Sequence, residues 1–379
     1  MTENKGKNIR KHSKTKTKKK RTRKEKLLIA GCVLVGVALL FSVIFIIVWN
    51  SKPLDNQKGK DFNAKLESDF DSESITTKEE QVNFLIAGEK ENLTDVLIVA
   101  SVNVKTNSVE ILQIPRDCYV SETYSTGKIN AAYTQYGSSD LKNIARTEKM
   151  IYDQFKLNID HYIVVNLSAF RRIIDSMGGI PINITERVVF NNNSILEPGQ
   201  QTLNGKEAEW FVRERHNRGD GSDISRIKMQ RVFLAAFVER VKSLGLKKIV
   251  SSVIPAVVKD IDNLSSDMTV NQMSDYAKMF INISQANIRI HMIPGEGYQI
   301  LYANGRKNSV YAIHAQSTAD LLNTYFRPYS PKVEVDKLGI ISIKGVKDTG
   351  SYENTQDDFQ SLLNGEKPGK QKNDSSKIN

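Results

Sequence analysis

A layered α/β or α+β domain with a mixed sheet, preceded by one transmembrane helix, is the fold class that this sequence predicts. Three observations lead to it. Residues 27–49 form an uncharged apolar run. Residues 81–335 alternate short apolar segments with segments of helical periodicity, a pattern typical of layered domains. Residues 50–80 and 336–379 are polar and lack that periodicity, so we expect a linker before the domain and a largely disordered tail after it.

The apolar run is long enough to cross a membrane, because a spanning helix needs roughly 20 residues. The preceding residues 1–26 hold thirteen lysines and arginines against two glutamates, and positive charge stays on the cytoplasmic side. We therefore expect a cytoplasmic polybasic tail, a signal anchor in the cell membrane and an extracellular main domain. A cleaved signal peptide would have a shorter apolar region and a small-residue cleavage site. A core helix of a soluble protein would have polar positions in its apolar stripe.

The basic character of the chain is confined to its N-terminus. The net charge is +11, and residues 1–26 supply all of it, so the remainder is formally neutral. Anionic lipids of the inner leaflet attract a tail of this kind. Charge alone also permits a nucleic-acid role for the tail, but the main domain has no basic excess, and we expect no nucleic-acid partner.

The main domain begins with strands. Apolar runs at 82–88, 95–103 and 108–115 predict three strands, and the polar turn between the last two indicates a hairpin. Ser168 is an expected N-cap, and Gly245 should end the longest helix. Further strands are expected at 161–167, 180–185 and 288–295. Helices are expected at 129–136, 140–155, 168–177, 223–244, 247–260, 269–283 and 311–326.

Common hydrolase, zinc and nucleotide motifs are missing from the sequence: it contains no G-x-S-x-G, HExxH, Walker A loop or Cys/His cluster. Charged residues instead stand at the ends of predicted elements. Arg116 and Asp117 follow an apolar strand, and charged side chains at a strand end lie over the sheet edge where α/β domains collect ligands. The alternative is an ordinary surface ion pair at a strand exit.

A second pair of cations follows the segment EAEWFV. If the chain is extended here, Arg213 and Arg215 point to one face and Glu214 to the other. Two guanidiniums on one face repel unless an anion lies between them, and a phosphate or pyrophosphate fits because the planar fork gives bidentate hydrogen bonds. The alternative is two solvated arginines paired with Glu209 or Glu214.

The longest predicted helix opens with three polar residues that form another candidate site. Arg226 and Gln230 are four residues apart and share a helix face. Asp223 lies at the helix start, where its carboxylate either belongs to the ligand site or only caps the helix.

Two carboxylates complete the set. Glu89 and Asp95 stand at adjoining strand ends and can hold one Mg²⁺ between themselves and phosphate oxygens; the alternative is that they are ordinary acidic turn residues. The charged residues together indicate an anionic ligand outside the membrane, and a lipid-linked pyrophosphate suits a protein tethered to that membrane.

Several segments together resemble the LytR-CpsA-Psr family of bacterial envelope proteins. The resemblance covers residues 82–327 and also includes the short basic tail and single span. The segments are QIPRDCYV (113–120), KINAAYTQYG (128–137), HYIVVNLSAFRRIIDSMGGIPINI (161–184), LNGKEAEWFVRER (203–215), SDISRIKMQR (222–231) and IPGEGY (293–298).

The resemblance implies a fold and an activity. Members of this family look like phosphotransferases that move an anionic glycopolymer, teichoic acid or capsular polysaccharide, from an undecaprenyl-pyrophosphate carrier onto peptidoglycan. Their domain has α/β/α layers and an apolar pocket for the prenyl chain. Arginines hold the pyrophosphate, and acidic residues hold Mg²⁺, or Mn²⁺ in its place.

The resemblance also assigns roles by position. Glu89 and Asp95 would bind the metal. As a hypothesis of mechanism drawn from charge rather than from position, either Asp117 or Asp223 accepts the hydroxyl proton, and Arg116 joins them in the catalytic set. Pyrophosphate binding falls to Arg116, Lys128, Arg213, Arg215, Arg226 and Gln230.

The sequence departs from the family at the metal motif. The family usually has G-x-D followed by R-S-D, whereas this chain has Ala87-Gly88-Glu89 and Leu93-Thr94-Asp95. The arginine is absent, and the glutamate carboxylate lies one carbon further from the backbone. An alternative function is therefore a non-catalytic, polyprenyl-phosphate-binding envelope scaffold or regulator. A transcriptional attenuator fits the topology poorly, because only residues 1–26 would face the cytoplasm.

Overall fold

The computed structural model describes residues 81–134, 143–191, 194–214, 223–258, 264–328, 330–348, 350, 356–357 and 359–364. The expected cytoplasmic tail, membrane span and linker lie outside these ranges. Within them, no helix combines the length and the apolar character that crossing a membrane requires.

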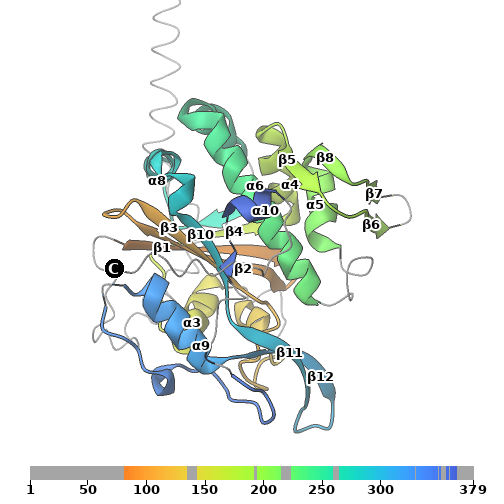
Figure 1. Ribbon diagram of the computed structural model, residues 1–379, viewed down its shortest axis with the longest axis vertical. Helices are drawn as coiled ribbons and strands as arrows, with labels where there is room; N and C mark the ends of the chain where they lie inside the picture. The colour runs from red at the N-terminus through yellow and green to blue at the C-terminus, as the bar shows by residue number, and fades with distance from the viewer. Residues whose placement is uncertain are drawn as a thin grey trace, which may run out of the picture. The chain divides into compact units, whose positions relative to one another are not determined.

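Seven strands of the described residues form one mixed sheet (Figure 1). Their order is β13-β10-β3-β2-β1-β4-β9. The β1–β2 and β2–β3 pairs are antiparallel, whereas β4 runs parallel to β1 and β10 runs parallel to β3. The expected hairpin and mixed sheet are therefore confirmed. The strands are β1 (Gln81–Lys90), β2 (Leu93–Asn103), β3 (Ser108–Ile114), β4 (His161–Asn166), β9 (Leu264–Ser266), β10 (Ile288–Met292) and β13 (Gln356–Asp357).

Helices cover both faces of this sheet (Figure 1). Successive side chains of a strand point to opposite faces, so Leu85 packs into one apolar cluster and Phe84 into another. The Leu85 cluster includes residues of α3 (Ile144–Phe155), α9 (Ala315–Leu321) and the 3₁₀ helix η1 (Ile129–Tyr133). The Phe84 cluster includes residues of α6 (Asp223–Lys248), α8 (Val270–Asn282) and α10 (Phe359–Leu363). The layers are thus α/β/α.

A third apolar cluster packs α6 against the segment between β4 and α6. Separately, an antiparallel hairpin follows β10. The segment contains α4 (Leu167–Ser176), β5 (Ile180–Ile184), β6 (Val188–Asn191), β7 (Ser194–Leu196), β8 (Gly199–Leu203) and α5 (Gly205–Arg213). The hairpin consists of β11 (Gly295–Leu301) and β12 (Lys307–Ile313). The remaining elements are η3 (Ile249–Val253), α7 (Ile254–Val258), η4 (Gln285–Asn287), η5 (Leu322–Phe326) and η6 (Val335–Lys337).

A helix cap and a helix start differ from their predictions, and a predicted helix stop is confirmed. Asn166, not Ser168, caps α4, because its side chain accepts hydrogen bonds from the first backbone amides of the helix. The helix expected from residue 311 begins at Ala315, because the preceding residues pair with β11. Gly245 interrupts α6 with a φ of 69°, a conformation that favours glycine; the predicted stop is confirmed, although helical backbone resumes after it.

The C-terminal segment also departs from its prediction. Residues 336–379 were expected to be largely disordered, but β13 pairs with β10, and Phe359 and Leu362 are buried in the Phe84 cluster. The Asp348 carboxylate accepts hydrogen bonds from backbone amides at the start of α9. The folded part therefore continues past residue 335, and residues 365–379 lie outside the described ranges.

Candidate functional site

Four strands end at the same edge of the sheet. β1, β3, β4 and β10 run in one direction, so Glu89 pairs with Asn166 and Gln113 pairs with Met292 near their carboxyl ends. Ligands of open α/β sheets bind outside this edge. Arg116 follows β3 at the same edge, and the predicted site residues of the first three strands are thereby brought together.

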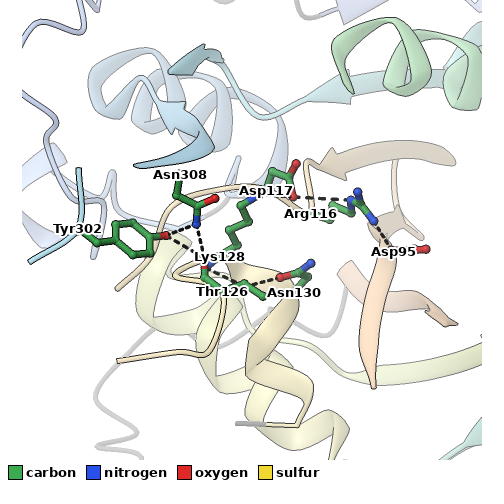
Figure 2. Close-up of polar contacts among 8 residues, drawn as sticks. All are labelled: Asp95, Arg116, Asp117, Thr126, Lys128, Asn130, Tyr302 and Asn308. Carbon is green, nitrogen blue, oxygen red and sulfur yellow. Dashed lines mark hydrogen bonds and ion pairs between the residues drawn. The ribbon is translucent and has the colours of Figure 1, made fainter. Parts of the chain in front are cut away.

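A β-bulge shapes the start of β2. Gly88 pairs with Val96 and Glu89 pairs with Thr94, which makes Asp95 the extra residue of β2. A bulge bends its strand and re-aims a side chain, and bulges are over-represented beside active sites. Here the Asp95 carboxylate contacts the guanidinium of Arg116 (Figure 2).

Arg116 belongs to a row of alternating charges. Its Nε lies 3.7 Å from Asp117 Oδ1, and Lys128 Nζ lies 3.2 Å from the same oxygen. Figure 2 shows Asp117 between the two cations and Asp95 beyond Arg116. We call Asp95, Arg116, Asp117 and Lys128 the strand-end row. Their side chains are between 16% and 31% exposed, so the row is more than an ordinary solvated surface pair.

Glu89 lies beside the row and accepts a hydrogen bond from the Tyr133 hydroxyl at 3.0 Å. Burial, together with the nearby Glu89 carboxylate, raises the pKa of Tyr133, so the hydroxyl stays protonated and donates. Among the described residues, no three or more His, Cys, Asp or Glu side chains gather as a metal site would require. Two carboxylates on adjoining strands still match Mg²⁺, which is commonly held by one or two carboxylates plus substrate phosphates.

The second predicted cation pair has a different local structure. Arg213 is the last residue of α5 and is helical, so the condition of an extended backbone is not met at this position. Its guanidinium contacts Glu209 one turn earlier, as the surface-pair alternative proposed. Arg171 of α4 contacts the same carboxylate, whose side chain is only 3% exposed. Arg215 lies outside the described residues, so the shared face is untested. We call Arg171, Glu209 and Arg213 the α4–α5 cluster.

Gln230 of α6 links β3 to α5 through two hydrogen bonds. Gln113 Nε2 donates to Gln230 Oε1 at 2.9 Å, and Gln230 Nε2 donates to Val212 O at 3.3 Å. The end of β3, the first turns of α6 and the end of α5 are therefore adjacent. Arg226, one turn before Gln230, is buried. The structure describes Asp223 only as the first residue of α6, without its side chain.

Three residues of the site were not predicted. Arg171 resembled any solvated helix residue, and nothing in the sequence pairs it with a buried glutamate. Tyr133 lay inside a segment expected to be helical, without a sign that its hydroxyl reaches Glu89. Gln113 did carry a signal, because it is a polar residue within the apolar run before Pro115.

Known proteins are similar to this chain in sequence or in fold. The polyisoprenyl-teichoic acid–peptidoglycan teichoic acid transferase TagU of Bacillus mycoides is 30% identical over 283 residues, which cover 72% of this chain and 86% of that protein. The cell wall biosynthesis protein LcpA of Corynebacterium glutamicum is 30% identical over 209 residues, 47% of this chain and 39% of that protein. The crystal structure of B. subtilis TagV has the same fold, with a TM-score of 0.55 and 22% identity over 67% of this chain and 100% of that one.

The family match covers most of the chain. The model of the LytR_cpsA_psr family matches residues 50–326, a range that contains the six quoted segments of the main domain and the whole strand-end row. The resemblance is confirmed: this chain belongs to the LytR_cpsA_psr family.

Proposed function

We propose that this protein is a membrane-anchored phosphotransferase that attaches an anionic glycopolymer, teichoic acid or capsular polysaccharide, from an undecaprenyl-pyrophosphate carrier to peptidoglycan. The observation that carries the proposal is the strand-end row, placed at the ligand-binding edge of the sheet in a chain of this family. The name of the TagU relative, a teichoic acid transferase to peptidoglycan, supports the reaction class. The apolar run at 27–49 and the basic residues 1–26 support a membrane anchor with the domain outside.

The cations of the site suit a diphosphate. Arg116 offers a planar fork that matches two phosphate oxygens, and Lys128 adds a point charge. Both are already held by carboxylates, so their positions are set before the ligand arrives. Arg213, Arg226 and Gln230 lie on the adjoining ends of α5 and α6, and Arg215 would extend this group.

Phosphoryl transfer needs positioning and charge stabilisation more than covalent chemistry from the protein. A peptidoglycan hydroxyl attacks the phosphorus that carries the glycan, and polyprenyl phosphate leaves. Arginines aimed at the phosphate oxygens stabilise the charge that develops there. Asp117 or Asp223 accepts the hydroxyl proton; Asp117 is the one that lies within the strand-end row.

Glu89 and Asp95 would hold Mg²⁺, or Mn²⁺ in its place, together with phosphate oxygens. Such an ion would supply further stabilisation of charge at the leaving phosphate. The chain orients both carboxylates: Tyr133 donates to Glu89, and Arg116 contacts Asp95. A carboxylate has two oxygens, so an arginine and a metal can share one.

The experiment is a transfer assay with the full-length protein in detergent, a lipid-linked glycopolymer donor and peptidoglycan fragments, with the product identified by mass spectrometry. We expect transfer by the wild type and a loss of about 100-fold or more in Arg116→Ala, the usual effect of removing one transition-state donor. Arg187→Ala is the matched control, because Arg187 forms an exposed ion pair with Glu197 elsewhere. Binding of polyprenyl phosphate without transfer from any donor would replace this proposal with the scaffold or regulator.

A further inference from the structure

The hairpin of β11 and β12 contacts the loop at residues 115–128 near both of its ends. Near the first end, the Tyr311 amide donates to Asp117 O at 2.8 Å, and the Tyr119 amide donates to Tyr311 O at 3.0 Å. Near the other, the Tyr302 hydroxyl donates to Thr126 O at 2.8 Å. The same hairpin therefore fixes the backbone beside both Asp117 and Lys128, whose side chains form an ion pair with each other.

The contact at Thr126 is a compact hydrogen-bond network (Figure 2). Asn308 Nδ2 donates to Thr126 O at 3.0 Å and to the Tyr302 hydroxyl at 2.7 Å. Tyr302 is 5% exposed, and burial raises its pKa, so its hydroxyl remains a donor. Thr126 Oγ1 in turn accepts from the Lys128 amide at 3.2 Å and donates to Asn130 Oδ1 at 2.9 Å. The network thus reaches from the hairpin to the backbone of Lys128.

Gly127 shows how closely the hairpin approaches the loop. Its φ is +70°, and a Cβ at this position would lie 2.0 Å from the Tyr302 hydroxyl oxygen. Any side chain here would push Tyr302 away, so glycine permits the contact. The residue after this glycine is Lys128, whose Nζ lies 3.2 Å from Asp117 Oδ1.

We propose that Tyr302 and Asn308 are positioning residues for the strand-end row. They fix the peptide units around Gly127 and thereby hold the Lys128 ammonium beside Asp117, where it meets the diphosphate. Neither residue touches the row's charged groups directly, so both act through the backbone of the loop. This inference rests on the proposed function in one respect, namely that the ligand of the row is a diphosphate.

A double-mutant cycle tests the proposal, with farnesyl diphosphate as the soluble probe and calorimetry on the full-length protein in detergent. Tyr302→Phe removes the hydroxyl and keeps the ring, and we expect it to weaken the affinity about three- to tenfold, the equivalent of one hydrogen bond. In a Lys128→Met background the same substitution should change nothing further, because residues that act through one another are not additive. Asn308→Ala should behave like Tyr302→Phe.

Tyr298→Phe is the matched control, because Tyr298 lies in the same hairpin and its hydroxyl donates to Lys344 O at 3.0 Å, away from the loop. It should leave the affinity unchanged, and thermal unfolding of the two Phe variants should show both folded. Equal affinity losses with and without Lys128, or no loss in Tyr302→Phe, would overturn the proposal. So would a wild type that does not bind farnesyl diphosphate. The transfer assay reports separately on the proposed function, since a wild type can bind the probe and fail to transfer.

Discussion

The strand-end row and the α4–α5 cluster both hold arginines against carboxylates, but their charges add up differently. In the row, Arg116 and Lys128 meet two aspartates, so the four charges cancel. In the cluster, Arg171 and Arg213 share one carboxylate, that of Glu209, which leaves one positive charge in excess among these three residues. The row is therefore electrically balanced, and the cluster carries the net positive charge that attracts an anion.

Burial reinforces this difference. The single carboxylate of the cluster is almost fully buried, whereas its two arginines are partly exposed. A buried carboxylate needs its partners, so Glu209 ties the middle of α4 to α5 through Arg171. The row has its carboxylates on a strand and a loop at the sheet edge, where they can also meet a metal or a proton. We infer that the cluster serves binding and the row serves both binding and chemistry.

The largest expected effect comes from breaking the row at its outer carboxylate. We expect Asp95→Asn to lower Mg²⁺-dependent transfer by about 100-fold or more, because it removes a proposed metal ligand and the anionic partner of Arg116. The free energy of unfolding should fall by less than about 1 kcal/mol, since the Asp95–Arg116 pair is partly exposed. Transfer rates titrated with Mg²⁺ and with EDTA provide the measurement.

Glu89→Asp is the companion variant. It keeps the carboxylate and restores the length that the family pattern has at this position, so activity should be preserved or raised. If neither EDTA nor Asp95→Asn affects transfer, the proposed metal site is wrong, and the row would act through its cations alone.

The next effect concerns the excess charge of the cluster. Arg213→Ala should weaken diphosphate binding by about 1.5–3 kcal/mol, the range for a hydrogen bond to a charged group. The stability should change by less than about 1 kcal/mol, because the side chain is partly exposed. Calorimetric titration with farnesyl diphosphate measures the first quantity and urea unfolding the second, with Arg187→Ala as the control. A loss of stability with unchanged affinity would make Arg213 purely structural.

The sequence predicted the sheet better than it predicted these charged groups. Strand ends follow from apolar runs, so the positions of Glu89, Asp95 and Arg116 at one edge could be inferred and are confirmed. The end of α5 could not: an extended backbone at Arg213 was considered only as a condition, although the Asn204–Glu207 capping box that starts the helix was present in the sequence. Helical spacing shows which residues share a face, but it does not show what covers that face.

Two further differences have the same physical origin. Arg231 carried no predicted role, yet it is only 1% exposed. Phe359 and Leu362 are isolated apolar residues in a polar tail, and they become buried only because α6 and the sheet provide a surface for them. Both cases depend on contacts between distant segments, which local pattern does not contain.

A third effect tests whether Glu209 is the structural centre of its cluster. Glu209→Gln keeps the shape and one acceptor but removes the charge that holds two guanidiniums together. We expect the free energy of unfolding to fall by about 1–2 kcal/mol, because the arginines are partly exposed and remain solvated after the change. Urea unfolding of Glu209→Gln and of the surface control Glu197→Gln gives the comparison. Equal stabilities for the two variants would contradict the distinction between the cluster and an ordinary surface pair.

The smallest expected effect lies at the opposite end of the sheet and depends on pH. His161 Nδ1 lies 3.0 Å from Asp267 Oδ2, and its Nε2 lies 3.0 Å from the Tyr276 hydroxyl. The hydrogen bond to Asp267 raises the pKa of His161 above its ordinary value. The protonated ring is therefore favoured in the folded state, and its stabilisation is present below the unfolded pKa of about 6.5 and is lost as the pH rises through the folded pKa.

The pair is partly exposed, so the loss should amount to about 1 kcal/mol or less. Asp267→Asn removes the charge and keeps the side-chain oxygen that accepts from the Tyr162 amide. It can therefore be compared directly with His161→Gln, which removes the other side of the contact. Urea unfolding from about pH 5.5 to 9 should show the wild type losing stability relative to both variants as the pH rises. A difference that stays constant over this range would show that the His161–Asp267 contact is insensitive to protonation. Transfer activity normalised to folded protein should not follow this stability curve, because the pair lies at the end of β4 that is remote from the strand-end row.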